Sequence, residues 1–310
     1  MKILIIKFGA LGDIILATPL LRCILEDHQG AAVTLLTSPA FAPLFQDWPG
    51  LEVKAQPRHG LAAFWRTLCW MRAQQFTRLI DLQSNDRSGL LCALSGIPER
   101  IGNHPRFPYH RHPPDRYTGQ CHAYDRLNQV LRAGGMGPAA GPPELPAPPP
   151  VQAQVRDWLA GHKLFPGGYV LLHAGSSHRH ARKRWPFYGE LAEALAAHGL
   201  TPVWIGGKED RELNHSLAQQ RGLDATGLFS ILELAELGRH AVFAVTNDSA
   251  PMHILACSGI PVYGLFGPTD WRRTHALGQA RHVITAPDGD LARLSAESVL
   301  ARLKADGRVD

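Results

Sequence analysis

The sequence lacks several patterns that point to particular classes of protein. Its 310 residues include 5 cysteines, widely scattered and without a Cys-x-x-Cys pair, so nothing indicates a zinc site, a redox dithiol or a disulfide framework. Lys7 and Asp13 interrupt the apolar start, and no run of about 18 uncharged apolar residues follows, so neither an export signal nor a membrane span is predicted. A reduced cytoplasmic compartment fits this cysteine usage best.

Charge is also sparse and nearly balanced. Only 19% of the residues are charged, and 32 Lys+Arg against 27 Asp+Glu give a net charge of +5. This excess is modest, and the basic residues gather after predicted strands rather than along one exposed helix, so no nucleic-acid partner is expected. A hydrophobic share of 45% excludes a disordered chain, and the length predicts two domains.

What is present is an alternation of short apolar runs with helical segments. Apolar runs that favour β structure predict strands at residues 2–8, 32–36, 79–82, 169–173, 202–206, 241–245 and 261–266. Helical apolar spacing predicts helices at residues 13–27, 64–78, 88–94, 151–160, 187–198, 231–237 and 251–257. This alternation is typical of α/β proteins with parallel sheets covered on both faces.

A composition break divides the alternation in two. Residues 134–150 are mostly Gly, Pro and Ala, which suits a semi-rigid connector rather than a packed element. We therefore predict an N-terminal α/β domain over residues 1–140, a Pro-rich linker over 141–151 and a C-terminal α/β domain over 152–310. Ligands of doubly wound sheets bind at the carboxyl ends of the strands, so functional residues are expected in a cleft between the domains.

The first predicted strand ends in a glycine turn followed by a carboxylate. Residues 8–13 read FGALGD, which lacks the G-x-G-x-x-G order of a dinucleotide site and disfavours a nicotinamide dehydrogenase. Two interpretations of Asp13 stay open from this pattern. It either caps the following helix or acts as a general base at the strand end.

Two later strand ends favour an anionic ligand. Residues 173–186 read HAGSSHRHARKRWP. Any one of these arginines alone favours a solvated basic loop, but hydroxyls with a basic cluster after a strand are typical of phosphate binding. Residues 246–253 read TNDSAPMH. Here Asp248 or Ser249 is a candidate helix cap, Pro251 suits the first helical turn, and the amino terminus of such a helix attracts phosphate.

Several segments together resemble a known family. They read KILIIKFGALGDIILATPLLRCI, DLQSNDRSGLLCALSGIPERIG, HAGSSHRHARKRWP and NDSAPMHILACSGIPVYGLFGPTD, with HAYDRLNQVLRAGG as a weaker match. They are similar to the bacterial ADP-heptose:lipopolysaccharide heptosyltransferases, glycosyltransferase family 9. The resemblance runs over nearly the whole chain and implies the α/β GT-B fold, two doubly wound Rossmann-like domains facing a cleft, in which the last helix is free to pack back on the N-terminal domain.

The resemblance also implies an activity. The expected enzyme is an inverting, metal-independent glycosyltransferase that moves a heptose or related sugar from an ADP-sugar to an anionic glycan or lipid-linked acceptor, with the lipopolysaccharide inner core as the expected acceptor. No cofactor is implied, and the triplet at residues 110–112, HRH, is too poor a ligand set to indicate a metal. The implied location is cytoplasmic, at the inner face of the cytoplasmic membrane, with peripheral membrane contact left open.

The family's site residues can be placed on matching positions of this sequence. Asp13 matches the proposed catalytic base. The positions matching donor-binding residues are Ser176, Ser177, Lys183, Glu233, Asp248, Ser249, Ala250 and His253. Acceptor contacts are expected in the first half of the chain, at Gly12, Arg87, Arg100, Arg106 and His122, because guanidinium groups bind carboxylates and phosphates well.

Two other classes stay open. A nucleotide-sugar epimerase of GT-B-like fold would use similar diphosphate loops, but it needs further acid-base residues around the sugar, and no candidates are identified in the sequence. A non-catalytic protein that binds sugar nucleotides or anionic glycans would keep the fold without using Asp13. The products formed without an acceptor distinguish the epimerase, and the effect of Asp13→Asn distinguishes the binding protein.

Overall fold

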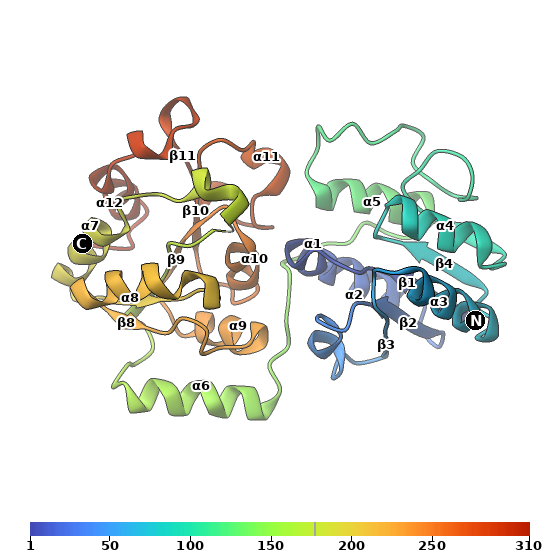
Figure 1. Cartoon of the computed structure of the whole chain (residues 1–310), viewed down its shortest axis with the longest axis horizontal. Helices are drawn as coiled ribbons and strands as arrows, with labels where there is room; N and C mark the ends of the chain where they lie inside the picture. Colours follow the sequence, from blue (N-terminus) through green and yellow to red (C-terminus); the bar gives the residue numbers. More distant parts are fainter. Residues whose placement is uncertain (177) are drawn as a thin grey trace. The chain divides into compact units, whose positions relative to one another are not determined.

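The chain folds into two compact units. A computed structural model describes residues 1–176 and 178–310, without the side chains of residues 178 and 179. The units are Met1–Pro146 and Ala147–Asp310 (Figure 1). The division falls inside the range 141–151 where the sequence places a linker. Each unit carries its own parallel sheet and core, and each is described separately below.

The first unit is built on a five-stranded parallel sheet of order β3-β2-β1-β4-β5. The strands are β1 (Lys2–Ile6), β2 (Ala32–Thr37), β3 (Leu51–Ala55), β4 (Arg78–Asp81) and β5 (Glu99–Ile101). The helices are α1 (Leu11–Leu16), α2 (Thr18–Asp27), α3 (Leu61–Ala73), α4 (Asp86–Leu94) and α5 (Ala123–Ala133), with a short 3₁₀ helix η1 (Ala42–Phe45). From Ile3 to Ile6, β1 is fully buried, as expected for a parallel strand with both faces covered.

The second unit contains a six-stranded parallel sheet of order β11-β10-β9-β6-β7-β8. Its strands are β6 (Tyr169–His173), β7 (Thr201–Trp204), β8 (Leu223–Asp224), β9 (Ala244–Asn247), β10 (Val262–Phe266) and β11 (Val283–Thr285). The α-helices are α6 (Pro149–Gly161), α7 (Tyr188–Ala197), α8 (Arg211–Gln220), α9 (Ile231–Arg239), α10 (Ala250–Ala256), α11 (Trp271–Thr274) and α12 (Ala296–Ala305). The 3₁₀ helices are η2 (His178–Lys183), η3 (Lys208–Asp210), η4 (Ala280–His282), η5 (Pro287–Gly289) and η6 (Leu291–Arg293).

Both sheets are doubly wound from a strand near the middle. In the first unit the chain starts at β1, moves outward through β2 and β3, and then returns to β4 on the other side of β1. The second unit repeats this course from β6, through β7 and β8, and back to β9. The strand order reverses between β1 and β4 and between β6 and β9. Ligands of such sheets bind at the carboxyl ends of these central strands, so the site is sought there.

The last helix, α12, belongs to the core of the second unit. It packs on α7, and Val299 and Leu303 are fully buried in the same cluster as Trp204 and Tyr263. Apolar side chains on one stripe of α12 therefore close this core, as expected for an amphipathic surface helix.

The segment predicted to be an unpacked connector is partly packed. The Ala139 amide donates to Asn128 Oδ1 at 2.8 Å and the Glu144 amide to Thr18 Oγ1 at 3.0 Å, while Leu145 is fully buried. The prediction is therefore wrong for the part of the segment before Ala147, because side chains of α2 and α5 satisfy its backbone. Its last two residues begin α6, where proline suits the first helical turn.

Other differences from the sequence-based assignment have simple causes. The single helix predicted for residues 13–27 is divided at Ala17 into α1 and α2, with Pro19, which lacks an amide hydrogen, in the first turn of α2. Of the unpredicted strands, β5, β8 and β11 have only two or three residues, and β3 is mostly exposed or half-exposed, which weakens its apolar pattern. Within the described residues, no helix is both long enough and apolar enough to cross a membrane.

Candidate functional site

Asp13 lies just beyond the carboxyl end of β1. It is the third residue of α1, whose N-cap position is Ala10 and has no side-chain cap. The capping interpretation is therefore wrong for Asp13, and its carboxylate is partly exposed. A carboxylate that is not used by its own helix terminus is available to a ligand at the strand end.

The turn that carries Asp13 is fastened to the neighbouring strand. Gln83, just after β4, accepts hydrogen bonds through Oε1 from the amides of Phe8 at 2.7 Å and Gly9 at 3.1 Å. Gly9 has φ +139°, and a Cβ at this position would lie 2.8 Å from a ring carbon of Phe41. Glycine is thus required here because of its backbone conformation and because a larger side chain would meet Phe41. The two hydrogen bonds to Gln83 hold the turn from which α1 begins.

A buried cation lies behind the same turn. The Lys7 side chain is 4% exposed and donates from Nζ to the Leu82 carbonyl at 2.9 Å. Burial lowers the pKa of Lys7, while the carboxylates of Asp13 and Asp81 act in the opposite direction and favour the charged ammonium. The Lys7 side chain thus ties the end of β1 to the backbone that follows β4.

Asp81 organises the end of β4. Its fully buried carboxylate accepts through Oδ1 from the amides of Gln83 at 2.9 Å and Ser84 at 3.1 Å, and through Oδ2 from the Tyr109 hydroxyl at 2.5 Å. Burial and the neighbouring Asp81 both raise the pKa of Tyr109, so its hydroxyl keeps its proton as a donor. Sequence patterns did not identify this network; its one signal was a carboxylate ending an apolar strand.

The residues expected to contact an acceptor divide into two groups. Arg100 donates from Nε to the Pro108 carbonyl at 2.7 Å and from Nη1 to the Ile97 carbonyl at 2.6 Å. His122 is buried and caps α5 by accepting from the Tyr124 amide at 3.2 Å. Both side chains thus have structural roles inside the first unit, and neither is carried into the proposal below.

Of the other acceptor candidates, Gly12 and Arg87 are half-buried and Arg106 is exposed. Gly12 is the second residue of α1, beside Asp13. Arg87, in the first turn of α4, stands over the Phe64 ring and donates to the Gly60 carbonyl at 3.1 Å. For these three positions, a contact with the acceptor stays a prediction.

In the second unit, a lysine and an aspartate expected to bind the donor come together. Lys183, the last residue of η2, places Nζ 2.6 Å from Oδ2 of Asp248, which follows β9. The Thr269 hydroxyl donates to the same oxygen at 2.8 Å. The Asp248 side chain is 9% exposed and that of Lys183 21%. A cation is therefore held, still partly accessible, at the reversal point of the sheet.

Asn247 locks the two strand ends to each other. It is fully buried and donates from Nδ2 to the carbonyls of Ala174 at 2.9 Å and Gly175 at 3.1 Å. Its Oδ1 accepts from the Trp185 amide at 3.2 Å. One amide side chain thereby joins the loop after β6 to the end of β9. Its only sequence signal was the polar run after an apolar strand.

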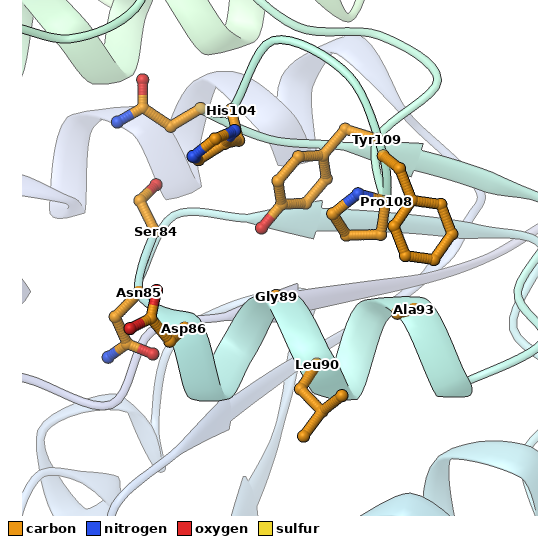
Figure 2. Close-up of a pocket in the computed structure, with 11 residues that line it drawn as sticks. Ser84, Asn85, Asp86, Gly89, Leu90, Ala93, His104, Pro108 and Tyr109 are labelled. Atoms are coloured by element: carbon orange, nitrogen blue, oxygen red, sulfur yellow. The ribbon is translucent and has the colours of Figure 1, made fainter.

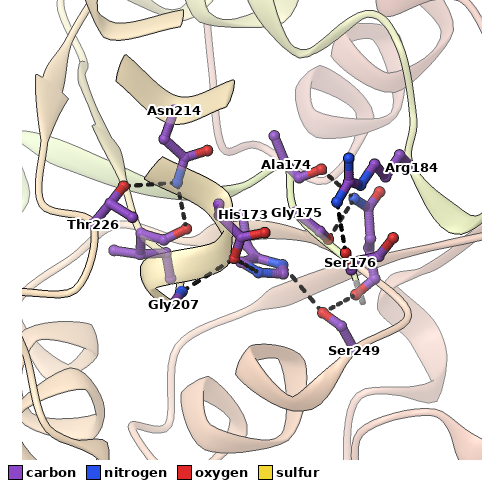
Figure 3. A network of polar contacts seen from close by, with 12 residues as sticks. His173, Ala174, Gly175, Ser176, Arg184, Gly207, Asn214, Thr226 and Ser249 are labelled. Carbon is purple, nitrogen blue, oxygen red and sulfur yellow. Dashed lines mark hydrogen bonds and ion pairs between the residues drawn. The ribbon is translucent and has the colours of Figure 1, made fainter. Parts of the chain in front are cut away.

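A histidine at the end of β6 bridges two other polar side chains (Figure 3). His173 Nδ1 lies 3.1 Å from the Ser249 hydroxyl, and its Nε2 lies 3.6 Å from Oδ2 of Asp210. Burial raises the pKa of Asp210, but the hydrogen bonds from His173 and the Gly207 amide outweigh it, so this pKa lies below its usual value. Asp210 is thus ionised at neutral pH, and the bridge fixes the position of Ser249.

The remaining donor candidates differ in burial and in their hydrogen-bond partners. Ser176 is buried, donates to the His180 carbonyl at 3.0 Å and accepts at its own carbonyl from Arg184 at 2.8 Å. Glu233 accepts from the Ser230 amide at 2.6 Å in the capping box of α9. Ala250 is the first residue of α10, and His253 is buried in the same helix. Ser177 lies outside the described residues.

No cluster of three or more His, Cys, Asp or Glu side chains able to hold a metal ion is found in residues 1–176 and 178–310.

Two doubly wound α/β units, with the candidate site residues at the reversal points of both sheets, define a fold of the GT-B type. The sequence matches the model of glycosyltransferase family 9 (heptosyltransferase) over residues 61–304. That match covers most of the chain, which therefore belongs to this family of glycosyltransferases.

Individual relatives agree with the family and the fold. The chain is 29% identical over 121 residues to lipooligosaccharide heptosyltransferase 2 of Haemophilus influenzae, a match that spans 36% of this chain and 35% of that protein. The crystal structure of a family 9 glycosyl transferase from Veillonella parvula superposes with a TM-score of 0.85 at 22% identity, over 98% of this chain and 96% of that chain. The E. coli heptosyltransferase WaaC, solved with ADP, gives 0.77 at 20% identity, over 99% and 100%. The predicted fold class is thus confirmed.

Proposed function

We propose that this chain transfers a heptose, or a closely related sugar, from an ADP-sugar to an anionic glycan acceptor of the lipopolysaccharide inner-core type. Family membership supports glycosyl transfer, and the ADP bound to the E. coli relative supports the nucleotide. The observation that carries the proposal is the pairing of Lys183 with Asp248 at 2.6 Å, at the reversal point of the second sheet. Lys183 is expected to bind the diphosphate and Asp248 the sugar of the same donor molecule.

In this proposal the second unit binds the donor. The Lys183 ammonium binds the diphosphate, and Asp248 accepts hydrogen bonds from sugar hydroxyls while keeping Lys183 in place. Ser176 and Ser249 add hydroxyl groups near the phosphates. The other proposed donor contacts are Ser177, Glu233, Ala250 and His253. Because ADP gains negative charge as it leaves, a fixed cation stabilises the transition state more than the bound substrate.

The chemical step is proposed to be a single displacement with inversion. Asp13 takes the proton from an acceptor hydroxyl as that oxygen attacks the anomeric carbon, and the bond between this carbon and the phosphate oxygen of ADP breaks. The position of Asp13 just beyond the end of β1 and its partly exposed carboxylate support this role, since a base must reach the acceptor hydroxyl. With Lys183 taking up the charge on the leaving group, we propose that no bound metal takes part.

The first unit is proposed to bind the acceptor. Arg87 and Arg106 would pair with carboxylates or phosphates of an anionic glycan, and Gly12 leaves room beside Asp13 for the reacting sugar. Both units are required, because Asp13 belongs to one and the donor residues to the other. An acceptor attached to lipid would place the enzyme at the inner face of the cytoplasmic membrane.

Nucleotide preference tests the donor assignment. A ligand that binds only the native state raises its apparent stability, by about 2.7 kcal/mol when present at 100 times its Kd. We expect ADP and ADP-sugars to raise the Tm of the full chain, and UDP and GDP to leave it nearly unchanged. A rise with UDP or GDP but not with ADP would contradict the proposal. Incubation of the ADP-sugar without acceptor tests the epimerase alternative, for which an epimerised sugar would be the product.

A further inference from the structure

A pocket of about 350 Å³ opens beside α4 in the first unit (Figure 2). It lies between α4 and the loop that follows β5. Polar side chains, among them Ser84, Asp86 and His104, stand on one side, and the rings of Pro108 and Tyr109 on the other. The volume falls within the range of small-molecule sites, about 300–1,000 Å³.

The aromatic side of this pocket is rigid. The Tyr109 hydroxyl is held by the buried carboxylate of Asp81 at 2.5 Å. The ring packs directly on Gly102, where a Cβ would lie 2.3 Å from a ring carbon. Tyr109 is also 7% exposed. The part of the ring that lines the pocket is therefore fixed, and together with Pro108 it forms a rigid apolar side, which lowers the entropic cost of packing a ligand there.

The polar side of the pocket offers little to an anion. Its described lining contains the Asp86 carboxylate, the amides of Asn85 and Asn103, the Ser84 hydroxyl and the His104 imidazole, but neither lysine nor arginine. An anion would therefore meet the Asp86 carboxylate, with His104 as the one basic side chain in the described lining. A sugar ring has an apolar C–H face, which fits Tyr109, and a rim of hydroxyls, which can donate to a carboxylate and exchange hydrogen bonds with amides.

The pocket is also joined to the turn that carries Asp13. Ser84 lines it, and the preceding residue, Gln83, holds the amides of Phe8 and Gly9. Asp81 binds the Ser84 amide with one oxygen and Tyr109 with the other. One network therefore supports both the pocket wall and the start of α1, within the first unit.

From this lining and this position we infer that the pocket is a subsite for an uncharged sugar residue of the acceptor glycan. That this sugar belongs to an acceptor rests on the proposed function, whereas the binding of a neutral sugar ring rests on the pocket alone. It adds a neutral-sugar contact to the anion contacts proposed for Arg87 and Arg106. An acceptor of mixed charge would be recognised by both.

Filling the pocket from Gly89 tests the inference. A Cβ at Gly89, in the middle of α4, would lie 3.8 Å from the Tyr109 hydroxyl, an ordinary contact. Gly89→Ala is therefore the matched control, and Gly89→Leu occupies the space. Both residues favour a helix more than glycine does, so neither change is expected to unfold α4. Asp86→Ala, at an exposed position, is a second variant that removes the carboxylate without filling the pocket.

Saturation-transfer NMR on the full chain, with neutral methyl hexosides and disaccharides as probes, gives the readout. We expect signal with the wild type and Gly89→Ala, and its loss with Gly89→Leu and Asp86→Ala. Equal signal in the wild type and Gly89→Leu overturns the inference. So does the absence of saccharide signal in the wild type, or a Gly89-dependent signal only from a methyl glucuronide or adenosine.

A kinetic comparison separates this inference from the proposed function. In a transfer assay Gly89→Leu is expected to raise the acceptor KM by about tenfold or more, with the ADP-induced rise in Tm unchanged. If the chain transfers no sugar and ADP does not bind, the proposed function fails while a Gly89-dependent saccharide signal still stands. If transfer occurs and this signal is absent, the subsite inference alone fails.

Discussion

Asp13→Asn is expected to lower sugar transfer by about 10²- to 10⁴-fold, the usual contribution of a general base. The amide keeps the shape of the side chain but cannot take a proton from the acceptor hydroxyl. Since Asp13 is not the N-cap of α1, helix stability is expected to change little. The measurement is the rate of acceptor-dependent ADP release at saturating substrates, together with the ADP-induced rise in Tm.

Asp47→Asn is the matched control for this change, because Asp47 is an exposed carboxylate elsewhere in the first unit. It should transfer sugar at the wild-type rate. Asp13→Asn should in turn bind ADP as the wild type does, since the proposed donor residues belong to the second unit. Full transfer activity in Asp13→Asn would remove Asp13 from the mechanism and indicate that a different group acts as the base.

Lys183→Gln is expected to weaken ADP binding by about 10- to 100-fold, the worth of a charge-assisted hydrogen bond to a phosphate. The rate of transfer at saturating donor should fall as well, by about 10²- to 10³-fold, because the cation stabilises charge that develops on the leaving ADP. Calorimetric titration with ADP measures the first effect, and steady-state ADP release at saturating donor measures the second.

Two further variants show whether the effect of Lys183→Gln comes from the loss of its positive charge. Lys163→Gln removes an exposed lysine of the same unit and should change neither quantity. Lys183→Arg keeps a positive charge beside Asp248, so it should bind ADP more tightly than Lys183→Gln does. Unchanged ADP affinity in Lys183→Gln would show that the ammonium serves only to pair with Asp248, and a loss of stability without a loss of affinity would support the same conclusion.

The central strands of both sheets were predictable from the sequence. The apolar runs of β1 and β6 are buried on both faces, and burial of this kind leaves a continuous hydrophobic signal. The four edge strands β3, β5, β8 and β11 were missed because all are only partly buried, and all except β3 have at most three residues. The residue pattern also gave no range to the amphipathic helices α5, α8 and α12, and a last helix was expected only from the resemblance.

The candidate site was predictable only in part, for a physical reason. Asp13, Lys183 and Asp248 stand in local motifs, so their positions could be matched one at a time. The side chains that hold them in place act across the chain: Gln83 reaches Gly9 over 74 residues, and Asn247 reaches Ala174 over 73. Such contacts depend on the sheet order, which local patterning does not specify. The same holds for Arg100 and His122: their hydrogen bonds to the loop after β5 and to the start of α5 were not predictable from local patterns, and an acceptor contact at either stays a prediction.

The most direct test of the account is product analysis by mass spectrometry. The full chain is incubated with ADP-heptose and a lipopolysaccharide inner-core acceptor, with and without the Asp13→Asn substitution. The account predicts an acceptor heavier by one heptose residue, one ADP formed for each transfer, and a product that nearly disappears with Asp13→Asn. An unmodified acceptor beside intact ADP-heptose, or beside an epimerised ADP-sugar, would contradict it.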